Sequence, residues 1–161
     1  MALGDRSVTT FTVTSDREIV MTRVFDAPRA LVFRAYTDPT LIPQWWGLRN
    51  LTTIVDKMDL RPGGAWRFIQ RGADGKEEAF NGVFREIVPP ERLVSTFEYE
   101  GTPGHVVVDT VTFEDAGGKT KVTARSVFAS VEDRDEMLTA GMEQGARETW
   151  DRLADLVEAM S

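Results

Sequence analysis

The sequence predicts an α+β fold, in which a curved antiparallel sheet of about seven strands surrounds a long C-terminal helix and two short helices follow the first strand. Short segments in which apolar and polar residues alternate recur between turn sequences, as expected of strands in series. From about residue 132 the apolar spacing becomes that of an amphipathic helix. The length of 161 residues suits one domain, expected over residues 17–161 after an N-terminal arm of residues 1–16.

The first part of the domain is expected to hold one strand and both short helices. The strand covers residues 17–26 and consists largely of β-branched and apolar residues. Pro28 suits the first turn of a helix that runs to about Asp38. Pro39 opens the second short helix, which ends at the Trp45-Trp46 pair.

Six further strands are expected in the middle of the chain, joined by short turns such as Pro62-Gly63-Gly64 and Gly117-Gly118. Strands in series with short turns pair antiparallel, and a sheet built in this way curves to give a concave face. The expected strands cover residues 51–60, 64–71, 77–88, 92–100, 105–114 and 119–128.

One unbroken helix is expected over residues 132–160, with a single apolar stripe for the concave face of the sheet. The stripe consists of Leu138, Met142, Ala146, Trp150, Leu153, Val157 and Met160. Gly141 and Gly145 lie beside it, and each costs about 1 kcal/mol in a helix interior relative to alanine. They indicate either close packing of the helix on a strand or room for a molecule between helix and sheet.

Composition excludes several classes of function. The net charge of −7 gives no basic surface for nucleic acid, and no apolar run is long enough to span a membrane. The chain has no cysteine and a single histidine, His105, so we expect neither a metal site nor a cofactor. The first residues lack the pattern of a secretion signal, which makes a cytoplasmic protein the expectation.

An ordered set of short motifs resembles a known family. The motifs are Arg23-Val24-Phe25-Asp26-Ala27-Pro28, Tyr36-Thr37-Asp38-Pro39, Trp45-Trp46-Gly47, Asp59-Leu60-Arg61-Pro62-Gly63-Gly64, Asp74-Gly75, Gly82-Val83-Phe84-Arg85-Glu86-Ile87, Pro89-Pro90-Glu91-Arg92-Leu93 and Trp150-Asp151-Arg152-Leu153. Together they are similar to the homologues of the activator of the heat-shock-protein-90 ATPase, in the START and polyketide-cyclase-like (SRPBCC) superfamily. The resemblance implies a helix-grip fold with an apolar cavity between sheet and helix.

Strand alternation and the helix stripe assign a set of residues to the wall of that cavity. A solid core would use the same aromatic residues, so both interpretations stay open at this point. The candidates are Trp45, Trp46, Trp66, Phe68, Phe80, Phe84, Phe97, Tyr99, Gly141, Met142 and Gly145.

The strand expected over residues 105–114 supplies the candidate catalytic groups. His105 and Asp109 share the face of the apolar residues of that strand, so both are expected to point inward. A buried carboxylate must be paired, protonated or solvated, and burial raises its pKa toward the range of a general base. Tyr99 would hydrogen-bond to Asp109 or orient a carbonyl group. A bulge near Gly104 would instead place His105 and Asp109 in solvent.

The sequence thus favours a module that binds a small hydrophobic molecule in an internal cavity. A cyclase or lyase that uses Asp109 or His105 as acid or base is one alternative. The other is a protein–protein adaptor or co-chaperone-like module, as the family name suggests. A homodimer is compatible with each of these functions.

Overall fold

The computed structural model describes residues 8–161 and has eight strands in one antiparallel sheet, ordered β1-β2-β8-β7-β6-β5-β4-β3. The strands are β1 (Thr10–Ser15), β2 (Glu18–Phe25), β3 (Thr52–Met58), β4 (Ala65–Arg71), β5 (Glu77–Val88), β6 (Arg92–Tyr99), β7 (Val107–Ala116) and β8 (Lys119–Val127). The helices are α2 (Arg29–Thr37), the 3-10 helix η1 (Ile42–Gln44), α3 (Val131–Thr139) and α4 (Met142–Met160).

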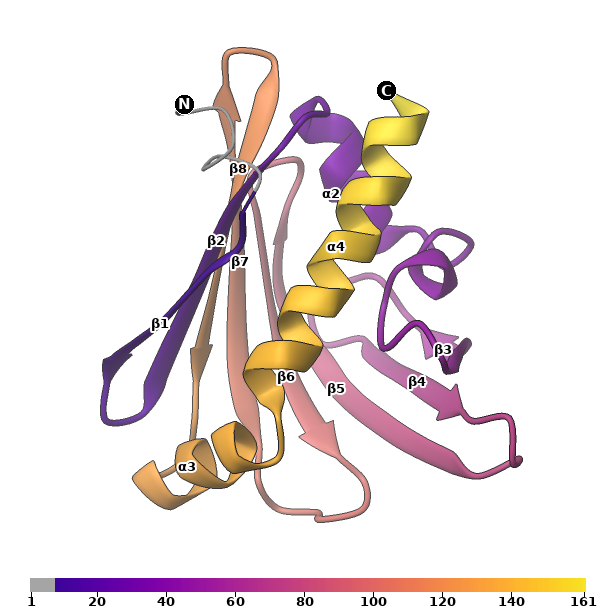
Figure 1. Ribbon diagram of the computed structural model, residues 1–161, viewed down its shortest axis with the longest axis vertical. Helices are drawn as coiled ribbons and strands as arrows, with labels where there is room; N and C mark the ends of the chain where they lie inside the picture. The colour runs from indigo at the N-terminus through magenta and orange to yellow at the C-terminus, as the bar shows by residue number, and fades with distance from the viewer. Residues whose placement is uncertain (1–7) are drawn as a thin grey trace.

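The predicted helix-grip architecture is confirmed. The sheet curves, and α4 crosses its concave side with α2 packed beside the C-terminal half of the helix (Figure 1). Helix α4 contacts α2, η1 and β2, so the long helix, both short helices and the sheet close around one interior. The main core cluster lies where these elements meet.

The sheet has one strand more than expected, because part of the predicted N-terminal arm is a strand. Strand β1 pairs antiparallel with β2, and Phe11 lies opposite Met21. Strand β1 alternates threonine with apolar residues, which favours extended backbone, but as an edge strand it stays largely exposed. Its weak burial explains why the hydrophobic pattern did not reveal it. Residues 1–7 of the predicted arm lie outside the described residues.

The expectation of one unbroken C-terminal helix is wrong. The backbone of Gly141 has φ +94°, a left-handed conformation that favours glycine, and it separates α3 from α4. Helix α3 therefore turns away from the axis of α4, as Figure 1 shows. Leu138 of α3 packs against a second, smaller cluster around Ile19 and Phe128.

Trp150 anchors α4 in the core. Its ring is 2% exposed and lies edge-on to Phe25, with ring centroids 5.6 Å apart. Its indole N–H donates a hydrogen bond of 2.9 Å to the Tyr36 hydroxyl of α2. One side chain thus joins α4 to β2 and to α2, and Trp150 belongs to the apolar stripe that the sequence assigns to the core.

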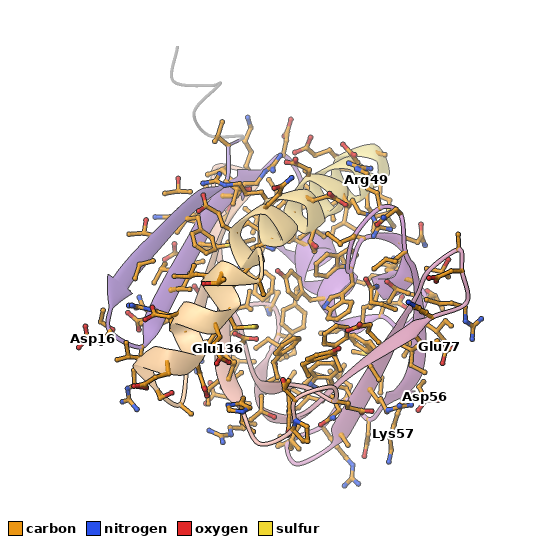
Figure 2. All side chains as sticks on the ribbon, turned by 60° about the horizontal axis from the view of Figure 1, so that its bottom comes forward. Asp16, Arg49, Asp56, Lys57, Glu77 and Glu136 are labelled. Carbon is orange, nitrogen blue, oxygen red and sulfur yellow. The ribbon has the colours of Figure 1, made fainter. Side chains whose placement is uncertain are left out.

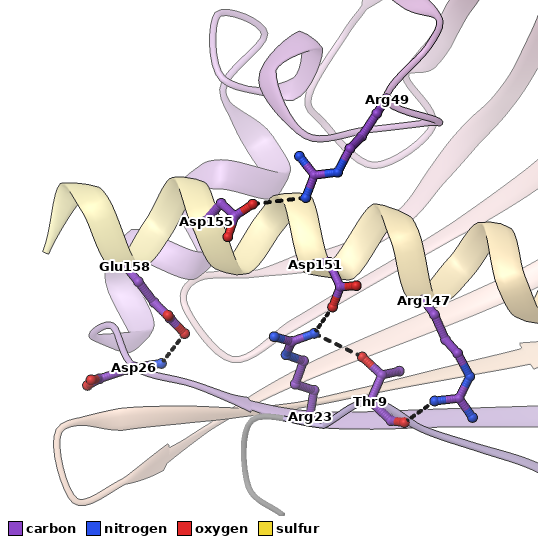
Figure 3. A network of polar contacts seen from close by, with 8 residues as sticks. All are labelled: Thr9, Arg23, Asp26, Arg49, Arg147, Asp151, Asp155 and Glu158. Carbon is purple, nitrogen blue, oxygen red and sulfur yellow. Dashed lines mark hydrogen bonds and ion pairs between the residues drawn. The ribbon is translucent and has the colours of Figure 1, made fainter. Parts of the chain in front are cut away.

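Polar contacts also hold the outer face of α4 along its length (Figure 3). The Arg23 guanidinium of β2 lies 2.6 Å from Asp151, and Arg49 lies 2.9 Å from Asp155. The backbone N–H of Asp26 donates to Glu158 near the C-terminal end, and Arg147 donates to the carbonyl oxygen of Thr9. Exposed ion pairs contribute at most about 1 kcal/mol each, so their main effect is to fix the position of α4 over the sheet.

Candidate functional site

A pocket of about 850 Å³ lies between the concave face of the sheet, α4 and the segment around η1. This volume falls in the range of pockets that hold drug-sized ligands, about 300–1,000 Å³. Figure 2 views the molecule from the end that carries α3 and shows side chains gathered between helix and sheet, whereas the labelled Asp56, Glu77 and Glu136 lie on the outside. All eleven residues that the sequence assigns to the cavity line this pocket; that they bind a ligand stays a prediction.

Aromatic rings from the segment after η1 and from three neighbouring strands form a continuous wall of the pocket. The ring of Trp46 lies edge-on to Phe68 and Phe80, with centroids 5.1 and 5.5 Å away. Phe80 in turn stacks on Phe97 at 5.5 Å and lies 5.3 Å from Tyr99. Contacts of this kind hold rings rigidly, so this wall presents a preformed apolar surface.

The two adjacent tryptophans have different roles. Trp45 is 3% exposed, and its indole N–H donates a hydrogen bond of 2.9 Å to the carbonyl oxygen of Ala35. Trp45 thereby fixes η1 to α2. Trp46 is only half-buried, and its carbonyl oxygen accepts a hydrogen bond from Thr53 of β3. The pair thus anchors η1 with one ring and adds the other to the pocket wall.

The exposed residues of the wall mark the mouth of the pocket. They come from three places: Leu48 after η1, Asp74, Lys76 and Glu78 at the β4–β5 turn, and Ala140 and Gly141 between α3 and α4. The break in the C-terminal helix therefore lies at this mouth. The left-handed backbone explains the glycine at position 141.

Gly145 supports the second interpretation of the helix glycines, room between helix and sheet. A Cβ atom built on Gly145 would meet only the Leu48 side chain, at 3.8 Å, which is an ordinary van der Waals contact. Close packing on a strand therefore does not require glycine here. The missing side chain leaves space in the pocket wall opposite Leu48.

Asp109 is a partly buried carboxylate in this apolar wall. Its register partners are Ser95 on β6 and Ser126 on β8, and all three residues line the pocket. The Ser126 hydroxyl donates a hydrogen bond of 2.6 Å to Asp109 Oδ1. Burial raises the pKa of Asp109 to about 6, and this hydrogen bond opposes the rise without cancelling it.

The expectation that His105 also points inward is wrong. Strand β7 begins only at Val107, after a turn in which Gly104 has φ +95°, so strand alternation does not extend back to His105. The imidazole is about half exposed, and its Nδ1 lies 2.8 Å from Asp133 Oδ1 on α3. His105 therefore lies outside the pocket wall, and the catalytic candidates reduce to Asp109 and Tyr99.

Tyr99 is not the partner of Asp109. It lies on β6 four residues from Ser95, the residue opposite Asp109, a separation of about 13 Å along a strand. A hydrogen bond with Glu78 is the main cause that raises the pKa of Tyr99. The structure thus places Tyr99 toward the mouth and Asp109 deeper in the pocket.

The polar residues of the pocket that were not predicted as site residues include Ser126 and Tyr36. Ser126 lies opposite Asp109 because of the β7–β8 register, and the turn at Gly117-Gly118 sets this register. That turn could therefore have been used to predict Ser126 as the neighbour of Asp109. Tyr36 comes from α2 and reaches the pocket only through packing. Burial raises the pKa of Tyr36, and the charge of Asp109 adds to this rise, so the phenol stays neutral.

Within residues 8–161, no helix is long and apolar enough to cross a membrane. No cluster of three or more histidine, aspartate or glutamate side chains in this part of the chain is arranged to hold a metal ion.

Comparison with known families decides the relationship. A family model described as Activator of Hsp90 ATPase homolog 1-like protein matches residues 26–158. The chain belongs to this family. This confirms the resemblance that the sequence motifs predicted, and the family model covers most of the chain. No curated protein matches the sequence.

Solved structures of several other proteins have the same fold as this chain. A protein from Arthrobacter aurescens has a TM-score of 0.87 at 24% identity, over 93% of this chain and 91% of that chain. A protein from Rhodobacter sphaeroides has a TM-score of 0.87 at 23% identity, over 94% and 99% of the two chains. A protein from Chromobacterium violaceum has a TM-score of 0.80 at 26% identity, over 89% and 99%. These similarities support the helix-grip fold of this family member.

Proposed function

We propose that the protein binds a small hydrophobic molecule in the pocket between the sheet and α4. The observation that carries this proposal is the pocket of about 850 Å³, with its aromatic wall and its mouth at the α3–α4 junction. Clefts of this size with few polar groups suit apolar ligands, because the ligand exchanges water for fixed apolar contacts. Membership of the family supports the fold that builds the pocket.

Native mass spectrometry of freshly purified protein tests this proposal directly. We expect a mass above that of the 18.0 kDa chain, which disappears after the protein is unfolded and refolded in detergent-free buffer. The emptied protein is then titrated with N-phenyl-1-naphthylamine, a neutral probe that fluoresces in apolar surroundings. Absence of both a bound molecule and probe binding would contradict the proposal.

Replacing Gly145 with leucine should block the pocket. The new side chain enters the space opposite Leu48, and we expect the affinity for N-phenyl-1-naphthylamine to fall about tenfold or more, which corresponds to about 1.4 kcal/mol. Folding should be retained, since glycine in a helix interior is disfavoured. Fluorescence titration measures the affinity. The matched control is Gln144→Leu, which adds the same side chain to an exposed neighbouring position outside the pocket wall. Equal affinities for the two variants would argue against a ligand beside Gly145.

A cyclase or lyase is the second candidate, and the environment of Asp109 favours it. A carboxylate with a pKa of about 6 is ionised at neutral pH and still basic enough to remove a proton from a bound molecule. Incubation of the identified ligand with the protein, followed by mass spectrometry of the small molecule, separates the two functions. An unchanged ligand supports binding alone, whereas turnover that Asp109→Asn abolishes supports the enzyme.

The adaptor interpretation would be favoured by an interior filled by the protein's own side chains, and the pocket volume argues instead for a small molecule as the partner. A homodimer and a cytoplasmic location stay predictions from the sequence.

A further inference from the structure

We propose that the pocket selects apolar molecules that carry a hydrogen-bond donor, above all a protonated amine, and that the donor binds Asp109 between Ser95 and Ser126. This inference rests on the proposed ligand-binding function and adds the chemical class of the ligand. It excludes apolar acids, such as free fatty acids, as the preferred class.

The register of three strands builds a polar row across an apolar surface. Ser95, Asp109 and Ser126 lie directly opposite one another on β6, β7 and β8, so their side chains leave the same face of the sheet. The next inward row toward the mouth contains Phe97 opposite Val107. The row on the other side is also apolar and contains Leu93, Val111, Ala124 and Met21. Of these three rows, only the central one presents polar side chains to a ligand.

The hydrogen-bonding capacity of this row is only partly used. Asp109 accepts one hydrogen bond, from Ser126 to Oδ1, and no hydrogen bond to its Oδ2 is present among the described residues. Nor does the Ser95 hydroxyl form a hydrogen bond within residues 8–161. An ionised carboxylate accepts several hydrogen bonds and donates none, so a ligand group that donates can complete its coordination. A ligand group that only accepts hydrogen bonds, such as a carboxylate, would be repelled by the carboxylate of Asp109.

The charged residues of the pocket wall also favour a ligand with a protonated amine over an anionic one. Its charged residues are Asp109 and, beside the β4–β5 turn, Asp74, Lys76 and Glu78, which makes three carboxylates and one amine. Among residues 8–161, no arginine lines the pocket to neutralise a ligand carboxylate. The chain as a whole carries a net charge of −7, which attracts cations and repels anions at long range.

Other titratable groups near Asp109 do not supply the missing partner. The charge of Asp109 contributes to the raised pKa of Tyr36 on α2, but among the described residues the Tyr36 hydroxyl accepts the indole N–H of Trp150 and forms no hydrogen bond to Asp109. Tyr99 on β6 interacts with Glu78 instead. From α4, Trp150 directs its N–H to Tyr36 rather than to the carboxylate.

Four naphthalene derivatives of nearly equal size test the proposal: 2-(2-naphthyl)ethylamine, 2-(2-naphthyl)ethanol, 2-ethylnaphthalene and 2-naphthylacetate. Each displaces N-phenyl-1-naphthylamine from the wild-type protein at pH 7.5, and the displacement curve gives its affinity. Because hydrogen bonds to a charged group are the stronger ones, we expect the amine to bind about tenfold or more tightly than ethylnaphthalene. We expect the acetate to bind more weakly than ethylnaphthalene.

The variant Asp109→Asn should remove the preference for the amine while N-phenyl-1-naphthylamine still binds. The matched control is Glu114→Gln, which removes one carboxylate from the same strand at an exposed position outside the pocket wall and should keep the preference. A second test needs only the wild-type protein. Lowering the pH through about 6 protonates Asp109 and should weaken binding of the amine but not of the alcohol.

The outcomes separate this inference from the proposed function. If the probe binds but the amine has no advantage, or keeps it in Asp109→Asn, the inference is overturned and ligand binding stands. If neither the probe nor any of the four compounds binds the wild-type protein, both are overturned.

Discussion

Asp109→Asn should raise the free energy of unfolding by about 2 kcal/mol above pH 7 and leave it nearly unchanged below about pH 4. The asparagine keeps the shape of the side chain and an oxygen that can accept the hydrogen bond of Ser126. It removes the cost of a charge in an apolar wall. Urea unfolding at several pH values measures the difference between variant and wild type.

The sign follows from the two pKa values of Asp109. In the folded protein burial raises the pKa of Asp109 to about 6, whereas an unburied aspartate has a pKa of 3.8. Below the lower value both states hold the proton, and the wild type keeps its full stability. Between the two values the unfolded state loses the proton first, which favours unfolding. Above about pH 6 both states are ionised and the whole penalty remains. Since the side chain of Asp109 is only partly buried, we expect about 2 kcal/mol rather than the full difference.

The groups that face Asp109 are Ser95 and Ser126 in the sheet and Tyr36 from α2. Neither serine titrates in this range, and the pKa of Tyr36 is raised, so Asp109 accounts for the expected difference between pH 4 and pH 7. Glu114→Gln serves as the control and should show no comparable pH-dependent gain. A stability gain in Asp109→Asn that is the same at all pH values would contradict a buried, titrating carboxylate.

Trp150→Ala should have the largest effect on stability, a loss of about 3–5 kcal/mol. The ring is 2% exposed and packs on Phe25, so its removal leaves a cavity where α4, α2 and β2 meet. It also removes the N–H that the Tyr36 hydroxyl accepts. Urea unfolding followed by circular dichroism measures the loss.

Trp150→Phe separates the two contributions. It keeps an aromatic ring but not the hydrogen bond to Tyr36, and we expect about a third to a half of the loss. Gln144→Ala, an exposed position on the same helix, is the control and should change stability by less than about 0.5 kcal/mol. A loss below about 1 kcal/mol for Trp150→Ala would show that α4 is not anchored through this residue.

The strands and the amphipathic helix could be predicted because their residues repeat at the period of the element. The face of β6 that carries Phe97 and Tyr99 points to the pocket, as alternation predicts. The alternation of apolar and polar residues led to wrong predictions only where the existence or the extent of a strand was predicted wrongly. Extending β7 back to His105 assumed strand backbone in a segment that is a turn, and β1 was missed because an edge strand need not bury a face.

The polar contacts of the site could not be predicted from residue spacing along one strand. Asp109 could be assigned to the concave face from its own strand, but its hydrogen-bond partner depends on the register with β8. The chain separation between Tyr36 and Trp150 is large, and their hydrogen bond forms only once α2 and α4 pack on the same sheet. The break at Gly141 likewise depends on a backbone conformation that glycine permits without requiring it.

The fold class, the family, the inward faces of the strands and the aromatic character of the interior were predictable from the residues alone, because each follows from local periodicity or from an ordered set of motifs. Three features became apparent only in the folded chain: the interior holds a pocket rather than a solid core, Asp109 lines it while His105 does not, and serines flank the carboxylate. The physical reason is that packing, strand register and burial bring together residues distant in the chain, and the volume left between them depends on all of them at once.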